Sequence, residues 1–311
     1  MKKYLIRFLK ISLLPLITFM CVFFIVYNYV PNCDYDTLKI RGYTIKRNRD
    51  LDAVIVGDSG AFNGIIPAEL YKQSGLCAYN SGKIASRVTH ANMYLNDMYD
   101  YQQPSVVIVE TTMFNYYWEL DENVSIEKYG FFESLYKNHN FIKKQLKVEK
   151  YIRDKGYTFV ATKNAYTGRF DYLEKNSQID FNKYITKQYI DKMVDIIRSN
   201  NSIPLFVNIP SVTYTNKTQC EATKKYCLDN DIDYIDFNYP NELENYTEQL
   251  DLTTDSHDKG VHLNCFGAKK VTDYIAWYLV NKMNVEPKGE NDYFENDCEK
   301  FFEVYAKYYK E

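Results

Sequence analysis

The chain has 311 residues, a length that accommodates one large domain with an insertion or two domains of ordinary size. Its apolar fraction of 46% and charged fraction of 25% are typical of a globular protein with a sizeable core. A net charge of −3 excludes the strongly basic balance of a nucleic-acid-binding protein, so we expect no nucleic-acid partner.

The amino-terminal residues carry a signal for membrane insertion. Residues 1–10 contain four basic side chains and no acid, and residues 11–30 carry no formal charge. Twenty such residues in a helix cross a hydrocarbon core of about 30 Å. The basic end before the span, with Asp34 and Asp36 after it, favours the amino end inside the cell. A cleaved signal peptide is the alternative, but no small-x-small cleavage site follows the span. We therefore expect residues 1–31 to be an uncleaved, single-pass anchor, with the rest of the chain outside the cytoplasm.

Cysteine usage gives little further information. Outside the predicted span, an even number of cysteines allows disulfides without revealing their pairing; they are Cys33, Cys77, Cys220, Cys227, Cys265 and Cys298. Cys220 and Cys227 fall in one predicted helix, about 10 Å apart along its axis, too far to form a bridge. Because there is no CxxC motif and no cluster of Cys and His, we expect neither a metal nor another cofactor.

The first predicted strand follows a polar connector at residues 32–51. Residues 53–56 are a continuous apolar run between Asp52 and the turn residues 57–60, a pattern typical of a buried strand in a parallel sheet. Ser59 then follows the strand end, where open α/β sheets place their ligands. An ordinary turn is the alternative, because Gly, Asp and Ser are favoured in turns in any case.

Strands and helices alternate through the rest of the chain. This alternation predicts a three-layer α/β/α domain at residues 52–285, built on a five-stranded parallel sheet. The predicted elements are strands at 76–79, 105–110, 203–209 and 233–236, helices at 67–74, 87–101, 182–200, 217–230 and 266–283, and a loop at 63–67. An aromatic-rich insertion at about 113–181, with helices near 127–137 and 141–155, is placed to roof a site. The tail at 286–311 is predicted to form one more surface helix.

Three short motifs together resemble the SGNH (GDSL-type) hydrolase superfamily. They are Gly57-Asp-Ser-Gly60, Asn80-Ser-Gly82 and the run from Asp258 to Ala268, DKGVHLNCFGA. The resemblance covers about residues 52–283. More narrowly, the chain is similar to membrane-anchored members that act with membrane-bound O-acyltransferases on cell-surface polymers, such as the alginate O-acetylation proteins and the teichoic acid D-alanylation protein. This resemblance implies a flavodoxin-like sheet and a reaction through an acyl-serine intermediate.

The catalytic candidates are Ser59 as nucleophile and His262 as general base, since a serine hydroxyl needs an imidazole to remove its proton. Family sequences usually place the acid three residues before the histidine, where this chain has Lys259. Asp258 is the first candidate for the acid and Asp255 is the reserve. The alternative for His262 is a loop histidine that caps the last helix.

The resemblance also implies an oxyanion hole formed by the amides of Ser59 and Gly82, with an asparagine after the third strand. Residues 110–115 read ETTMFN instead of the usual Gly-x-Asn-Asp. Asn115 is the candidate donor or else a loop residue, and Thr111 lies nearer the strand end. The remaining expectations are structural: Asp58 and Glu110 shape turns, and Asn264 and Gly267 serve as cap and close-packing position.

Two functions remain open. The first is a membrane-anchored, extracytoplasmic serine esterase or O-acyltransferase that moves acyl groups, acetyl above all, on a cell-surface glycan. Its partners would be the polysaccharide, its acyl donor and a multi-spanning membrane O-acyltransferase. The second is a non-catalytic adaptor of that acyltransferase complex. The Ser59 and His262 pair favours the enzyme. Aromatic rings after the third strand are candidates for stacking on sugars or for the core; they are Phe114, Tyr116, Tyr117 and Trp118.

Overall fold

The computed structural model describes residues 13, 15–22, 24, 35–44, 50–115, 125–126, 133, 136–137, 150–169, 171–174 and 184–308. The chain divides into two units, one of Met1–Leu38 with Ile126–Glu149 and one of Lys39–Ser125 with Lys150–Glu311. No helix among the described residues has both the length and the apolar character needed to span a membrane. Most of the predicted anchor, and most of the two helices predicted at 127–137 and 141–155, lie outside these residues.

The second unit is built on a parallel sheet of five strands in the order β2-β1-β3-β4-β5, so the predicted sheet is confirmed. The strands are β1 (Ala53–Val56), β2 (Ala78–Asn80), β3 (Val106–Glu110), β4 (Ile203–Asn208) and β5 (Asp233–Asp236). In this order the chain changes direction across the sheet between β1 and β3, and the crevice outside the carboxyl ends of those strands is where open sheets bind ligands. The sheet therefore presents its binding edge at the residues after β1 and β3.

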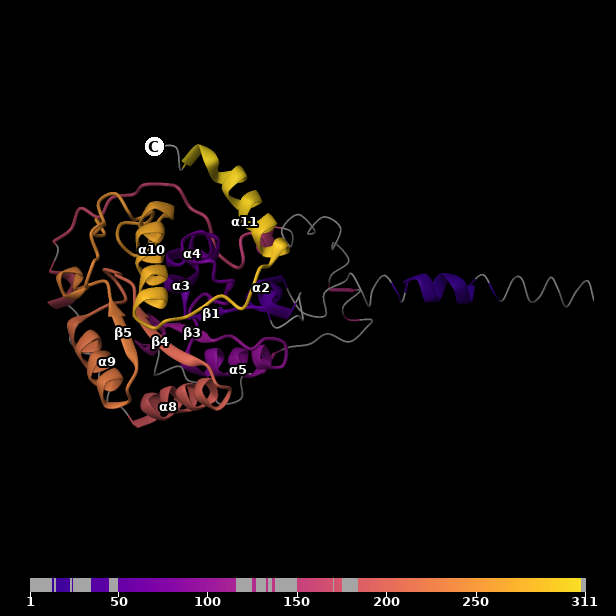
Figure 1. Ribbon diagram of the computed structural model, residues 1–311, viewed down its shortest axis with the longest axis horizontal. Helices are drawn as coiled ribbons and strands as arrows, with labels where there is room; N and C mark the ends of the chain where they lie inside the picture. The colour runs from indigo at the N-terminus through magenta and orange to yellow at the C-terminus, as the bar shows by residue number, and fades with distance from the viewer. Residues whose placement is uncertain are drawn as a thin grey trace, which may run out of the picture. The chain divides into compact units, whose positions relative to one another are not determined.

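Helices cover both faces of the sheet (Figure 1). Ala53 and Ile55 pack into one apolar cluster with α3 (Ser59–Gly64), α4 (Pro67–Ser74) and α10 (Cys265–Asn281). Val54 and Val56 pack into the other with α5 (Val88–Tyr99), α8 (Tyr184–Ser199) and α9 (Lys217–Asp229). All four β1 residues are buried, and burying a valine or isoleucine side chain contributes about 1.5–3 kcal/mol. The central strand is thus held from both sides, which fixes the residues that follow it.

The predicted loop at 63–67 is wrong in its first half, because α3 runs from Ser59 to Gly64. Asp58 caps this helix by accepting a hydrogen bond from the Gly60 amide at 2.7 Å. Two glycines in six residues lower the helix propensity, so the pattern alone indicated a loop. The following helix, α4, begins at Pro67, ends at Ser74 and is closed by Gly75 with φ of 73°, as predicted.

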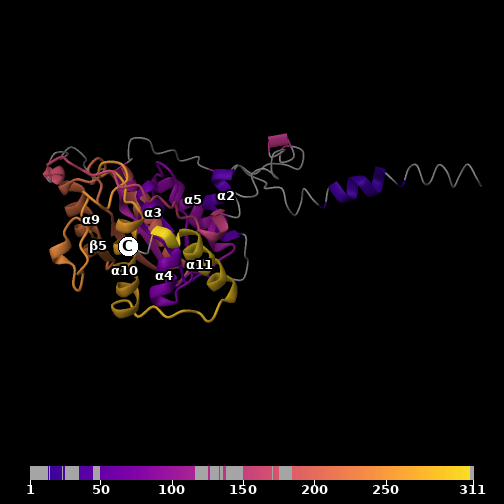
Figure 2. The same cartoon turned by 90° about the horizontal axis from the view of Figure 1, so that it is seen from above.

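The tail forms the predicted helix, α11 (Asp292–Tyr305). The prediction that this helix lies on the surface is wrong for one of its faces. Four side chains at helical spacing are buried in the core: Phe294, Cys298, Phe301 and Tyr305. Figure 2 shows α11 beside α4, and Tyr71 of α4 contacts the Phe294 ring. Part of the connector also belongs to this unit, since Arg41 forms an ion pair with Asp97 of α5 at 2.7 Å.

Candidate active site

Ser59 is the first residue of α3 and follows β1 after a tight turn. The turn requires Gly57, because a Cβ there would lie 2.6 Å from the Cβ of Glu110 on β3. Asn80, at the end of β2, donates hydrogen bonds from Nδ2 to the carbonyls of Ala61 at 2.8 Å and Ile65 at 2.9 Å. Neighbouring strands thus fix both ends of α3, and the partly exposed Ser59 stands at the sheet edge.

His262 lies in a reversing loop before α10. The loop is closed by an antiparallel bridge between Ser256 and Leu263. Lys259 and Gly260 make the reversal with φ of 62° and 88°, in the left-handed region that glycine tolerates best. The ends of this loop therefore meet, and His257 and His262 face one another across it.

The loop is anchored to α10 by the two positions for which structural roles were predicted. Asn264 is the N-cap of α10 and accepts hydrogen bonds from the Phe266 and Gly267 amides at 3.0 and 3.1 Å. A Cβ on Gly267 would lie 2.6 Å from the Asp255 carbonyl oxygen. Both predictions, a cap and a close-packing position, are confirmed.

Two other segments hold the loop in place. The Asn164 amide donates to the Ser256 carbonyl at 2.8 Å, and the Asn164 carbonyl accepts from the Lys259 amide at 3.0 Å. On the other side, the Val212 amide donates to the Gly260 carbonyl at 3.0 Å. The described part of the insertion therefore supports the loop that carries His262.

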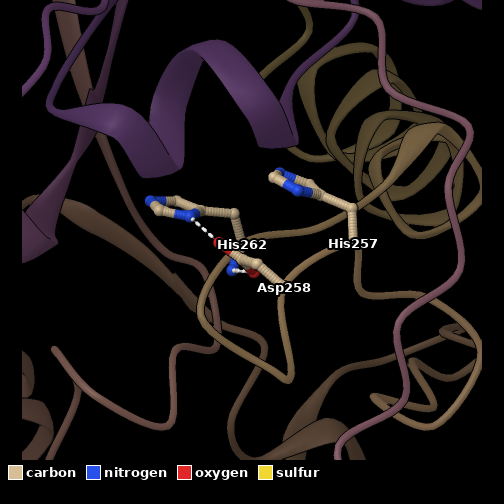
Figure 3. Close-up of side chains that lie close together, drawn as sticks. All are labelled: His257, Asp258 and His262. Atoms are coloured by element: carbon tan, nitrogen blue, oxygen red, sulfur yellow. Dashed lines mark hydrogen bonds and ion pairs between the residues drawn. The ribbon is translucent and has the colours of Figure 1, made fainter.

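The structure brings Ser59, His262 and Asp258 into one hydrogen-bonded chain. His262 Nε2 lies 2.7 Å from Ser59 Oγ, and His262 Nδ1 lies 2.5 Å from Asp258 Oδ2. The His262 amide also donates to Asp258 Oδ1 at 2.6 Å, so both carboxylate oxygens hold the same residue (Figure 3). A carboxylate that accepts the Nδ1 proton leaves the lone pair of Nε2 directed at the serine, the tautomer needed for a general base.

The reserve acid, Asp255, does not reach His262. Its carboxylate is buried and lies 2.8 Å from Lys270 Nζ of α10. It also accepts a hydrogen bond from the Asp251 amide at 2.8 Å. Of the two acids that the sequence left open, the structure places only Asp258 at the imidazole.

The two further oxyanion candidates differ in position. Gly82 packs against the turn, since a Cβ there would lie 3.0 Å from the Asp58 carbonyl oxygen, but its amide donates to Asn80 Oδ1 at 3.0 Å. Asn115 ends a 3₁₀ turn, η2 (Thr111–Asn115), and both of its amide hydrogens have acceptors, Tyr214 O at 2.5 Å and Gln219 Oε1 at 2.9 Å. The Gly82 amide and both amide hydrogens of Asn115 thus have acceptors within the fold, so the assignment of these two residues as oxyanion donors is corrected.

A pair of buried carboxyl groups lies behind Ser59. Asp58 is 1% exposed and Glu110 is not exposed at all. The Thr112 hydroxyl lies within hydrogen-bonding distance of both carboxyl groups, and its Oγ1 is 3.2 Å from Asp58 Oδ1. The Thr112 amide donates to Glu110 Oε1 at 3.1 Å. Burial raises the pKa of Asp58; burial and then the charge of Asp58 raise the pKa of Glu110 well above its ordinary value. Both shifts oppose ionisation, and the larger shift is that of Glu110.

This pair was interpreted from the sequence only as turn residues. The signal that could have found it is positional, because Asp58 follows β1 and Glu110 ends β3. In a parallel sheet whose order places β1 beside β3, such residues meet at the same edge.

The sequence analysis also assigned no role to His257, whose Nε2 is buried without a hydrogen-bond partner among the described residues. Burial lowers the pKa of His257.

No protein-family model and no curated protein matches this chain. Similar solved structures include a GDSL-like lipase from Bacteroides thetaiotaomicron, with 10% identity over 78% of this chain and 93% of the other and a TM-score of 0.41. A lipase/acylhydrolase from Enterococcus faecalis has 10% identity over 77% of this chain and 100% of the other, also with a TM-score of 0.41. Identities of this size transfer no residue roles, so the roles of Ser59, His262 and Asp258 depend on their own geometry.

Proposed function

We propose that this chain is a serine ester hydrolase or O-acyltransferase that works through an acyl-Ser59 intermediate. One observation carries the proposal: the unbroken chain of hydrogen bonds from Ser59 Oγ to His262 Nε2 and from His262 Nδ1 to Asp258 Oδ2, at 2.7 and 2.5 Å. These are the contacts of a nucleophile with its base and of the base with its orienting acid.

In the first half of the reaction, Ser59 Oγ attacks the carbonyl carbon of an ester and its proton passes to His262 Nε2. Asp258 stabilises the imidazolium that forms. When the tetrahedral intermediate collapses, the bond to the leaving alcohol breaks, and His262 returns the proton to the alcohol oxygen. The Ser59 amide, in the first turn of α3, has no acceptor within its own helix and is the proposed donor to the oxyanion.

In the second half, His262 removes a proton from an acceptor hydroxyl, which attacks the acyl carbon and releases Ser59. Water as acceptor gives hydrolysis, and a sugar hydroxyl gives transfer. We place the acceptor or donor on a cell-surface glycan, with acetyl as the group and a multi-spanning O-acyltransferase as partner. This part of the proposal is supported by the uncharged amino-terminal segment at 11–30 and by the motif resemblance. An anchor in that segment would confine Ser59 to the extracytoplasmic face of the cell membrane.

Of the two roles left open for the aromatic residues after the third strand, sugar stacking or core packing, Phe114 has the core role. Phe114 is 1% exposed and packs edge-on against Phe206 in the core. A ring that is sealed in this way does not stack on a sugar. Tyr116, Tyr117 and Trp118 lie outside the described residues.

The proposal is tested with a fluorophosphonate, which labels activated serines. We expect Ser59→Ala to abolish labelling and to change the acetyl content of purified surface glycan, without lowering protein abundance, because loss of a partly exposed hydroxyl has little effect on stability. Ser199→Ala, at the exposed end of α8, is the matched control and should label like the wild type. His262→Ala should cost as much activity as Ser59→Ala, since the two act as a unit.

One result would replace the enzyme by the adaptor. If glycan acetylation is unchanged in Ser59→Ala but is lost when the whole chain is deleted, the chain is needed and its serine is not. An unlabelled wild-type protein would point the same way.

A further inference from the structure

The loop that carries His262 places a second imidazole beside it. His257 and His262 face one another across the closed end of the loop, and the His257 amide donates to the His262 carbonyl at 3.3 Å. Their rings are nearly parallel, with centroids 5.8 Å apart and planes at 12°. Figure 3 shows the two rings side by side with Asp258 below them. The loop therefore gathers two imidazoles and one carboxylate.

This is a ligand set suited to a divalent transition metal. One donor atom from each of His257, Asp258 and His262 lies within 4.8 Å of the other two, and all three side chains are partly buried. Zinc binds such donors at about 2.0–2.2 Å, which separates two ligands of a tetrahedral ion by about 3.3 Å. The three donors thus need small side-chain rotations to converge. His257 Nε2, buried without a hydrogen-bond partner among the described residues, leaves that ring with a nitrogen to spare.

We propose that His257, Asp258 and His262 bind Zn²⁺, or a related divalent transition metal, and that this binding switches Ser59 off. The inhibitory half of the proposal rests on the proposed function, whereas the binding half does not. Two imidazoles favour zinc, cobalt and copper over magnesium and calcium, which prefer sites made only of oxygen ligands.

The inhibition follows from which nitrogen of His262 the metal takes. Nε2 faces Ser59 at 2.7 Å and Nδ1 faces Asp258 at 2.5 Å, so an ion shared with Asp258 binds Nδ1. Nδ1 then releases its proton to solvent and Nε2 takes one up, which leaves a neutral imidazole with its only N–H on Nε2. That N–H donates to Ser59 Oγ, and no lone pair remains to accept the serine proton. The metal therefore locks His262 in the tautomer that cannot act as a base.

Binding and inhibition are measured separately on the full-length chain. Co²⁺ serves as a spectroscopic probe, because its visible absorption reports coordination whether or not Ser59 reacts. The rate of fluorophosphonate labelling of Ser59 is then measured with Zn²⁺, with Mg²⁺ and after EDTA. We expect a Co²⁺ spectrum of one ion per chain, labelling slowed more than tenfold by Zn²⁺, full recovery with EDTA and no effect of Mg²⁺.

His257→Gln is the decisive variant, because glutamine keeps a polar side chain of similar length but is a poor zinc ligand. His257→Ala repeats the test if glutamine disturbs the loop. Either should label at the wild-type rate without metal and need at least about tenfold more Zn²⁺ for the same inhibition, since even loss of a partner outside the coordination shell costs 10–100-fold in affinity. Equal zinc inhibition in the wild type and both variants, or no Co²⁺ spectrum, would overturn the metal site. If Ser59 never labels but the Co²⁺ spectrum depends on His257, the site stands and the proposed function falls.

Discussion

Replacing Glu110 by glutamine should make the protein more stable than the wild type, and this difference should grow as the pH rises. In the wild type, Glu110 and Asp58 meet with almost no solvent exposure, and among the described residues neither carboxyl lies in an ion pair with a lysine or arginine. Two such groups cannot both ionise cheaply, so we expect Glu110, whose pKa is raised further than that of Asp58, to hold its proton. Glutamine has nearly the same shape, keeps a donor toward Asp58 and an acceptor toward Thr112, and has no proton to lose.

The size of the effect follows from the raised pKa of Glu110. A carboxyl whose pKa is higher in the folded state than in the unfolded state contributes stability fully below its unfolded pKa, and this contribution is lost as the pH rises toward the folded value. The wild type should lose about 1.4 kcal/mol of unfolding free energy for each pH unit in that window. The Glu110→Gln protein should not lose this free energy, because glutamine does not titrate. The difference between the two proteins should therefore grow at this rate from about pH 5 upward, until the pH passes the folded pKa.

Urea unfolding of both proteins at pH 5, 6, 7 and 8 measures the difference. Glu69→Gln is the control, because Glu69 is equally buried but lies 3.4 Å from Lys269 Nζ. It should destabilise the protein at pH 7, since Lys269 loses the fully buried one of its two carboxylate partners and keeps only Asp273. A Glu110→Gln protein that is less stable than the wild type by more than about 2 kcal/mol at pH 7, or whose difference from it is independent of pH, would show that Glu110 is ionised.

Two further predictions concern the loop before α10. Asp258→Asn should lower the rate of Ser59 labelling by about 10⁴-fold with little change in stability, because asparagine stabilises the wrong imidazole tautomer; normal labelling would rule out Asp258 as the orienting acid. Gly267→Ala should destabilise the protein by about 1–3 kcal/mol in urea unfolding and slow labelling, because its Cβ would lie 2.6 Å from the Asp255 carbonyl oxygen; an unchanged midpoint would show that this backbone moves freely.

The sheet and the position of Ser59 could be predicted because they depend on local patterns. The run at 53–56 is apolar throughout, as a strand buried on both faces must be, and the turn after it is marked by glycines. The end of α4 at Gly75 was predictable for a similar reason, since glycine adopts a positive φ at little cost.

What could not be predicted depends on partners far away in the sequence. The sequence ranks Asp258 before Asp255 without excluding Asp255, and the contact that separates them is the ion pair of Asp255 with Lys270, which needs the geometry of α10. Asn115 looked available because its acceptors, Tyr214 and Gln219, lie about a hundred residues further along the chain. The buried face of α11 has the spacing of an amphipathic helix, but nothing in the sequence says what covers it.

The two carboxylate systems around Ser59 have different tasks because they differ in access to solvent. The Asp258 side chain is 34% exposed and holds His262 by a direct hydrogen bond, so its loss should affect the imidazole tautomer first. Asp58 and Glu110 are sealed behind the turn and act on His262 only through space; burial raises the pKa of Asp58, and the charge of His262 offsets part of that rise. In the proposed reaction, Asp258 would orient the imidazolium through a hydrogen bond, and Asp58 would attract it through space.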